Sequence, residues 1–179
     1  MKMSNRWNHF IYRLWAPIYD STVEHFFRQG RQRAMALLAP QPGEHVIIVG
    51  VGTGADLPLL PGGVKVIGID LSGEMLRKAR QKLPQCRADI QIIQGDAQVR
   101  CLPEKHFDAA LLNLILSVVP DGTACLRETL SVLKAGGRII VFDKFQPEGK
   151  IPSSGRKLFN FFSTILDTDI SRQIGGITH

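Results

Sequence analysis

Three glycines directly after an apolar run are the residues of this chain most typical of a binding site. Residues 46–49 are all aliphatic, and Gly50, Gly52 and Gly54 follow at intervals of two. Such a run predicts a strand buried on both faces of a parallel sheet. The glycines let the backbone turn sharply and approach a ligand without a Cβ in the way. The alternative is an ordinary tight connection between a strand and a helix.

Asp70 is the second chemically informative residue. It lies 20 residues after Gly50, at the end of another apolar run at 64–69. A carboxylate at the end of such a strand can accept hydrogen bonds from the two hydroxyls of a ribose. The glycines and this acid together predict a nucleoside-containing cofactor. A dinucleotide stays open at this point, because Gly50, Gly52 and Ala55 also fit the pattern G-x-G-x-x-G/A.

Alternating strand and helix patterns predict the scaffold that positions these residues. We expect strands at 45–49, 64–69, 90–93, 107–112 and 138–142, and helices near 55–60, at 73–82 and at 123–134. Ser72 should cap the helix at 73–82, with Glu74 in its first turn, and Gly136 and Gly137 should close the helix at 123–134. This alternation predicts an α/β fold, Rossmann-like and doubly wound, with a mostly parallel sheet.

The two ends of the chain carry further helical patterns. Apolar residues at steps of three and four, among them Trp7 and Trp15, predict an amphipathic helix at 5–18. A second helical pattern covers 22–38, residues 144–156 are typical of a loop, and 157–166 form a strongly apolar helix pattern. We therefore predict a single domain over 1–179, with N-terminal helices at 1–40, a cofactor-binding core at 41–145, and a loop and apolar helix at 146–179.

Composition limits the classes of function. The chain has a net charge of +6. Its three cysteines lack metal-type spacing and its five histidines are scattered, so we expect no metal site. No apolar run is long enough to span a membrane and no signal peptide is recognisable, which predicts a cytoplasmic protein. The positive charge is concentrated in residues 1–40, which favours contact with an anionic membrane over nucleic acid, unless these residues form a solvated helix face.

The order of motifs resembles the class I S-adenosylmethionine-dependent methyltransferases over about residues 40–145. The matching segments are residues 50–54, 69–72, 95–97 and 133–138. The sequence Gly95-Asp96-Ala97 has no role in the dinucleotide fingerprint, so the resemblance favours S-adenosylmethionine as the cofactor. The cofactor-binding residues that it implies are Gly50, Gly52, Gly54, Asp70, Leu71, Asp96, Ala97 and Asn113.

The resemblance also implies individual roles. Asp70 would bind the ribose hydroxyls and Asp96 the adenine amino group, with a backbone contact from Ala97. Asn113 ends the fourth strand, where the reacting methyl should lie. Tyr19 would close over the cofactor as the catalytic candidate, or else pack at the end of a helix.

Within that superfamily the chain is most similar to bacterial phospholipid N-methyltransferases and quinone C-methyltransferases. The similarity rests on residues 15–20, 50–58 and 117–120. It implies methyl transfer to the amine headgroup of a phospholipid such as phosphatidylethanolamine. The alternatives are a quinone ring or another small molecule, or a degenerate membrane-associated protein that only binds the cofactor. The helix at 5–18 would then lie peripherally on the inner membrane face, or pack on the domain as a lid.

Two features depart from the family. Ile48 stands where the family usually has an acidic residue that helps anchor the methionine amino group of the cofactor, so another carboxylate could substitute. The family also closes its sheet with an antiparallel strand pair, and no strand pattern follows Asp143. We expect either that the chain is incomplete or that the sheet is shortened.

Overall fold

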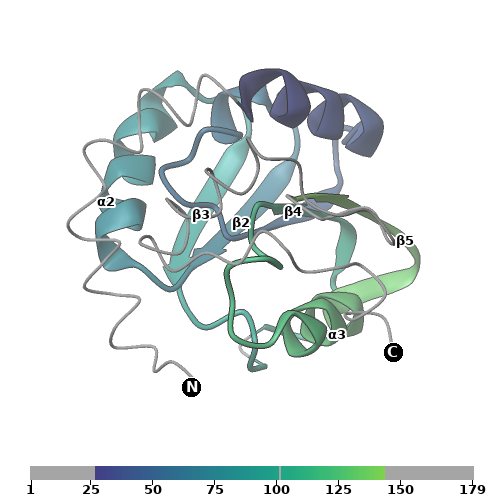
Figure 1. Ribbon diagram of the computed structural model, residues 1–179. Helices are drawn as coiled ribbons and strands as arrows, with labels where there is room; N and C mark the ends of the chain where they lie inside the picture. Colours follow the sequence, from purple (N-terminus) through teal and green to yellow (C-terminus); the bar gives the residue numbers. More distant parts are fainter. Residues whose placement is uncertain (1–26, 101, 144–179) are drawn as a thin grey trace, which may run out of the picture.

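Five parallel strands form the centre of the computed structural model, which describes residues 27–100 and 102–143. The strands are β1 (His45–Val49), β2 (Lys65–Asp70), β3 (Asp89–Gln94), β4 (Phe107–Asn113) and β5 (Leu133–Phe142). Their order in the sheet is β3-β2-β1-β4-β5 (Figure 1). The direction of the connections therefore changes on either side of β1, which opens a crevice at the carboxyl ends of β1 and β4.

Helices connect the strands and cover the sheet. A helix occupies residues 27–38, and α2 (Gly73–Lys82) and α3 (Gly122–Val132) follow, with short 3₁₀ helices η1 (Leu57–Leu59) and η2 (Leu83–Gln85). Ser72 caps α2 as predicted, because its hydroxyl accepts a hydrogen bond from the Met75 amide at 3.3 Å. Asp121 caps α3 in the same way, accepting from the Ala124 amide at 2.9 Å.

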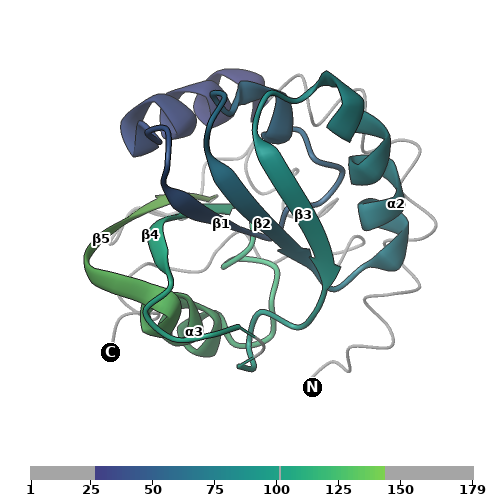
Figure 2. The same cartoon turned by 180° about the vertical axis from the view of Figure 1, so that it is seen from behind.

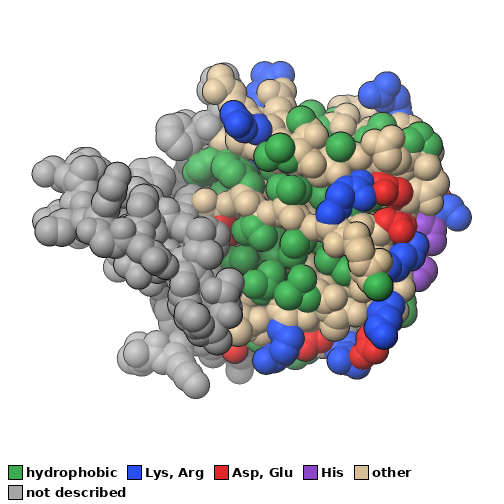
Figure 3. Space-filling model, turned by 90° about the vertical axis from the view of Figure 1, so that its right-hand side faces the viewer, with side chains coloured by type: hydrophobic (Ala, Val, Ile, Leu, Met, Phe, Trp, Pro, Cys, Tyr) green, Lys and Arg blue, Asp and Glu red, His purple; other side chains and the backbone are tan. Residues whose placement is uncertain are grey.

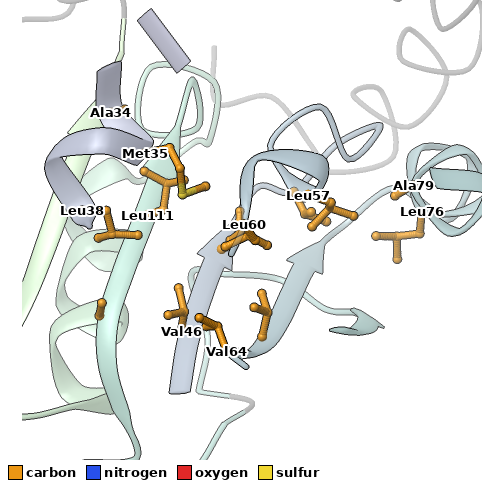
Figure 4. Packing of buried hydrophobic residues seen from close by; sticks show 14 residues of the cluster. Ala34, Met35, Leu38, Val46, Leu57, Leu60, Val64, Leu76, Ala79 and Leu111 are labelled. Atoms are coloured by element: carbon orange, nitrogen blue, oxygen red, sulfur yellow. The ribbon is translucent and has the colours of Figure 1, made fainter. Parts of the chain in front are cut away.

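The apolar side chains of β1 separate the core into two layers. Val46 and Ile48 pack in a cluster with residues of the helix at 27–38 and of α2, while Ile47 and Val49 pack in a second cluster with residues of α3. Figures 1 and 2 show α3 on one face of the sheet and the other two helices on the opposite face. Figure 4 shows the first cluster, in which Met35 and Leu38 lie beside Leu111 of β4. The doubly wound fold is thus confirmed.

The predicted boundary between the helix at 123–134 and the strand at 138–142 is wrong. Gly136 and Gly137 do not close α3, which ends at Val132 with an extended Leu133 after it. Both glycines lie inside β5, where Leu133 pairs with Phe107 and Arg138 pairs with Ala109. Four residues of β5 therefore stand opposite Asp108 alone, and Gly136 takes a φ of +77° in this bulge. The glycine pattern marked a backbone irregularity, but in a strand.

Several predictions fall on residues outside the described ranges. They are the helix at 5–18, Tyr19, the first part of the helix at 22–38, and everything after Asp143. Within the described residues β5 is an edge strand, and its Val141 is 38% exposed. Figure 3 shows hydrophobic side chains in the middle of the face on this side, with lysines and arginines around them. None of the helices described in the structure has the length and apolar character needed to cross a membrane.

Arg138 of β5 joins three separate segments. Its guanidinium donates two hydrogen bonds to the Glu44 carboxylate, at 2.8 and 2.6 Å, and others to the carbonyls of Leu38 and Ala39, at 2.7 and 3.2 Å. It thus ties the end of the helix at 27–38 to the start of β1. The hydrogen bond from Arg138 lowers the pKa of Glu44, while partial burial opposes that shift.

This pKa shift makes part of the stability depend on pH. An acid with a lowered folded-state pKa stabilises the fold above its unfolded pKa, and the contribution is lost as the pH falls through the folded value. We expect Glu44→Gln to lower the free energy of unfolding by about 0.5–1 kcal/mol at pH 7, because the pair is partly exposed. The difference from wild type should shrink below about pH 4.

Urea unfolding of wild type and Glu44→Gln at pH 7 and pH 3.5 checks this expectation. The other acids are common to both proteins, so their titration cancels in the difference. A difference that stays constant between the two pH values would contradict the role given to the Arg138–Glu44 pair.

Candidate functional site

A pocket lies at the edge of the sheet where the carboxyl ends of β1, β2, β3 and β4 meet. Seven of the eight predicted cofactor-binding residues line it: Gly50, Gly52, Asp70, Leu71, Asp96, Ala97 and Asn113. Parallel pairing produces this convergence, because it places the ends of all the strands on one side. Gly50 and Asn113, which are 63 positions apart in the sequence, thereby face one cavity.

Gly50 and Gly52 form the wall of the pocket below the end of β1. They adopt φ values of +73° and +54°, which an L side chain rarely takes. A Cβ added to Gly50 would lie 2.9 Å from the Cβ of Ile115. A Cβ added to Gly52 would meet only the Gly50 carbonyl oxygen, at 3.9 Å, so the space beside Gly52 is open for a ligand.

Gly54 is the predicted residue that does not line the pocket. It is buried, and its φ is +76°. A Cβ there would lie 2.8 Å from Cδ1 of Leu57 and 3.0 Å from Cα of Ala79 in α2. The space that this glycine leaves is therefore used by the close packing of the loop against α2.

Asp70 holds two loops of the pocket together. Its Oδ2 accepts a hydrogen bond from the Gly52 amide and its Oδ1 one from the Ser72 amide, each at 2.9 Å. Asp70 also lines the pocket, and an ionised carboxylate can accept the hydrogen bonds that the hydroxyls of a diol donate. The geometry thus fits a group that both shapes the glycine loop and faces a ligand.

Asp96 is oriented by Gln98, which follows it in the loop after β3. The backbone amide and the side-chain amide of Gln98 both donate to Oδ1 of Asp96 at 2.9 Å. The side-chain oxygen of Gln98 in turn accepts from the amide of Asp121, the residue that caps α3. A continuous series of hydrogen bonds therefore sets the position of Asp96 relative to α3.

A buried polar group beside the pocket was not anticipated from the sequence. Asp56 is completely buried, and its Oδ2 accepts a hydrogen bond from Nη1 of Arg31 at 2.6 Å. Burial raises the pKa of Asp56, and the charge of Arg31 opposes that rise. Arg31 and Asn113 both line the pocket. A charged residue in the otherwise apolar segment 56–60 was the available signal.

The residues after β4 supply an apolar wall. Leu114, Ile115, Val118, Val119 and Pro120 line the pocket on this side. Leu114 has a φ of +58°, and its amide donates to the Phe142 carbonyl at 2.8 Å. The segment is anchored further along by Ser117, whose hydroxyl donates to Asp143 at 2.5 Å. The pocket is thus polar over β2 and β3 and apolar beyond β4.

Such a pocket suits a molecule with a nucleoside at one end. Asp70 and Asp96 follow the adjacent strands β2 and β3. The glycine loop after β1 and the buried amide of Asn113 lie along the same edge of the sheet. S-adenosylmethionine fits this donor and acceptor set, and it has no pyrophosphate that would require a helix N-terminus. Tyr19, the predicted catalytic residue, lies outside the described residues. Among the described residues, no group of three or more metal-ligating side chains is present.

Comparison with known proteins points to the same cofactor chemistry. The family model described as "Methyltransferase domain" matches residues 47–141, which include all of the strands except parts of the first and the last. The chain is 32% identical over 157 residues to a phosphatidylethanolamine N-methyltransferase from Cereibacter sphaeroides, covering 86% of this chain and 76% of that protein.

Two further proteins show how broad the similarity is. A 2-phytyl-1,4-naphtoquinone methyltransferase from Synechococcus elongatus is 34% identical over 143 residues, and the match covers 74% of this chain and 61% of that protein. The crystal structure of a SAM-dependent methyltransferase from Thermotoga maritima superposes with a TM-score of 0.61 at 27% identity. That superposition covers 74% of this chain and 59% of the other.

The two glycines Gly52 and Gly54 should respond differently to substitution by alanine. Gly54→Ala introduces both a left-handed strain and a steric overlap, so we expect it to lower the free energy of unfolding by about 2 kcal/mol or more. Gly52→Ala introduces the strain alone, but its methyl group would stand in the pocket wall. We expect it to weaken binding of S-adenosylhomocysteine about ten-fold or more.

Urea unfolding and titration calorimetry of the two variants separate these effects. The placement of Gly54 would be refuted by a Gly54→Ala protein as stable as wild type. Unchanged affinity in a folded Gly52→Ala protein would refute the placement of Gly52.

Proposed function

The chain belongs to the class I S-adenosylmethionine-dependent methyltransferases, and on that premise we propose that it methylates the amine headgroup of a phospholipid such as phosphatidylethanolamine. The observation that carries the proposal is the extent of the match to the phosphatidylethanolamine N-methyltransferase from Cereibacter sphaeroides. That match covers more of this chain, and more of the relative, than the match to the naphtoquinone methyltransferase does.

The proposed cofactor contacts follow the order of the strands. Asp96, after β3, binds the adenine amino group, and the backbone of Ala97 adds a contact there. Asp70, at the end of β2, binds the ribose hydroxyls next to Leu71. Gly50 and Gly52, after β1, lie along the methionine portion. This assignment is supported by the sheet order β3-β2-β1-β4, which runs in the same direction as adenine, ribose and sulfonium in the cofactor.

Catalysis in this proposal depends mainly on positioning. When it is bound, S-adenosylmethionine supplies a methyl group that its sulfonium charge already activates. The residues around the end of β4 hold the acceptor in line with that methyl group and exclude water. The described residues that line the pocket include no histidine, lysine or glutamate. We therefore propose that the acceptor amine binds in its neutral form, without a dedicated base.

The acceptor is proposed to lie against the apolar wall of residues 114–120. Ile115, Val118 and Val119 can contact the less polar part of a lipid, while its amine lies near Asn113. The N-terminal residues Trp7 and Trp15 are proposed to bring the protein to the membrane, with Tyr19 closing over the cofactor. The same apolar wall would suit a quinone ring, and the naphtoquinone methyltransferase among the relatives supports that second candidate.

Transfer of labelled methyl groups distinguishes the two acceptors. Incubation of the protein with labelled S-adenosylmethionine and phosphatidylethanolamine vesicles should label the lipid. Demethylmenaquinone in the same vesicles should stay unlabelled. We expect Asp70→Asn to reduce lipid labelling about ten-fold or more, because it removes a charged acceptor from the cofactor site. Asp89→Asn, at the exposed start of β3, is the matched control and should leave the rate unchanged.

Label in the quinone and none in the lipid would replace the leading proposal by the second candidate. If neither the lipid nor the quinone is labelled by a protein that binds S-adenosylhomocysteine, both proposed acceptors are refuted.

Vesicle flotation tests the membrane contact. We expect wild type to float with vesicles that contain anionic lipid, and the double variant Trp7→Ala, Trp15→Ala to lose most of this binding, since it removes the aromatic side chains of the amphipathic pattern. Leu130→Ala, at a half-exposed position of α3, is the control and should float like wild type. Equal flotation of the double variant and wild type would refute the contact.

A further inference from the structure

A single glutamine side chain links two loops of the pocket that follow strands far apart in the sheet. Gln98 lies in the loop after β3, and its Nε2 donates to Oδ1 of Asp96 at 2.9 Å. Its Oε1 accepts from the Asp121 amide, in the connection between β4 and α3, at 2.8 Å. The sheet places β2 and β1 between β3 and β4. Backbone pairing of β3 with β4 therefore cannot hold these two loops together, and a side chain makes the link.

At the first end of this link, Gln98 fixes the orientation of a carboxylate in the pocket. The backbone amide and the side-chain amide of Gln98 both reach Oδ1 of Asp96, and both residues line the pocket. Two donors that converge on one oxygen restrict the rotation of the carboxylate about its Cβ–Cγ bond. In the proposed placement of the cofactor, Asp96 accepts from the adenine amino group. The strength of that bond depends on the orientation that Gln98 imposes.

At the other end, Gln98 holds the peptide group that closes the apolar wall of residues 114–120. The amide that donates to its Oε1 belongs to the Pro120–Asp121 peptide, and Pro120 lines the pocket. The Asp121 side chain also accepts from the Ala124 amide at 2.9 Å, in the first turn of α3. The end of the wall is thus held between Gln98 on one side and the start of α3 on the other.

A glutamine is suited to this position because its amide group carries a donor and an acceptor together. Nε2 is required at the carboxylate of Asp96 and Oε1 at the backbone amide of Asp121, so the two partners select one orientation of the amide. A glutamate at position 98 would supply the acceptor alone, and a methionine would supply neither.

We propose that Gln98 is a positioning residue for both substrates of the methyl transfer. Its Nε2 orients Asp96 toward the adenine of the cofactor, and its Oε1 fixes the end of the wall against which the methyl acceptor lies. The proposal rests on the proposed function for the location of the two substrates. It goes further, because it couples the binding of the cofactor to the position of the acceptor wall.

Two ligands that differ at one purine substituent test the adenine end by calorimetry. They are S-adenosylhomocysteine and an analogue with hydrogen in place of the 6-amino group. We expect Gln98→Met to weaken S-adenosylhomocysteine about ten-fold, because Asp96 loses the donor that orients it, and to leave the analogue unchanged. Gln91→Met, at an exposed position of β3, is the matched control and should bind both ligands like wild type.

Gln98→Glu separates the two ends of the link at pH 8. Its carboxylate still accepts from the Asp121 amide, but it has no donor for Asp96 and places a like charge beside it. We expect this variant to weaken S-adenosylhomocysteine at least as much as Gln98→Met does. With saturating cofactor, the KM of whichever acceptor is labelled should rise about three- to ten-fold in Gln98→Met and stay at the wild-type value in Gln98→Glu.

Hydrogen exchange of the Asp121 amide tests the coupling without any methyl acceptor. We expect S-adenosylhomocysteine to slow this exchange in wild type, because a fixed Asp96 holds Gln98 in the orientation that accepts from the amide. In Gln98→Met the ligand, added at a saturating concentration, should leave the exchange rate unchanged.

The proposed role at the adenine end is overturned if Gln98→Met weakens both ligands equally, or neither. The role at the wall is overturned by a ligand effect on the Asp121 amide that is the same in wild type and Gln98→Met, or by an acceptor KM that rises equally in both variants. A protein that methylates neither acceptor would refute the proposed function, but the calorimetry and the hydrogen exchange would still decide on Gln98.

Discussion

The parallel pairing of β1 with β2 on one side and β4 on the other is the constraint on which the site depends. Together with the pairing of β2 with β3, it brings four strand ends to one edge, and hydrogen bonds continue the pairing into the loops. The amides of Gly50 and Val51 both donate to the Ile69 carbonyl, at 2.9 and 3.0 Å, and the Gly95 amide donates to the Asp70 carbonyl at 3.0 Å. The pocket is therefore continuous with the edge of the sheet, and backbone hydrogen bonds to the strands hold its loops in position.

Polar side chains at this edge serve structure and binding together. Asp70 shapes the glycine loop through the Gly52 amide, and it also lines the pocket. Arg31 and Asp56 tie the helix at 27–38 to the loop after β1, and Arg31 also lines the pocket. A ligand in the pocket would stabilise the fold as well as complete the site, because it binds the folded chain alone.

Local patterns predicted much of this architecture. The strand at 45–49 and the helix at 73–82 have the predicted limits, because long apolar runs and a capped amphipathic pattern are decided within a few residues. Gly136 and Gly137 show where this reasoning fails. A glycine pair indicates an irregular backbone in either a helix end or a bulge, and only the pairing of β5 with β4 distinguishes the two. Gly52 lines the pocket whereas Gly54 packs against α2, and this difference also depends on tertiary contacts that a glycine pattern does not specify.

By itself, the sequence determined the order of the motifs along the chain, the glycine loop and the acids Asp70 and Asp96. Through these features it also indicated the family and its cofactor. These features are local, and each is carried by a short run of residues in a recognisable spacing. Only the tertiary structure decided that Arg31, Asp56 and Asn113 meet, since they are 25 and 57 residues apart along the chain and belong to a helix, a loop and a strand. The burial and the ionisation of these side chains depend on that arrangement, because a side chain is desolvated by its neighbours in space, whatever their distance in sequence.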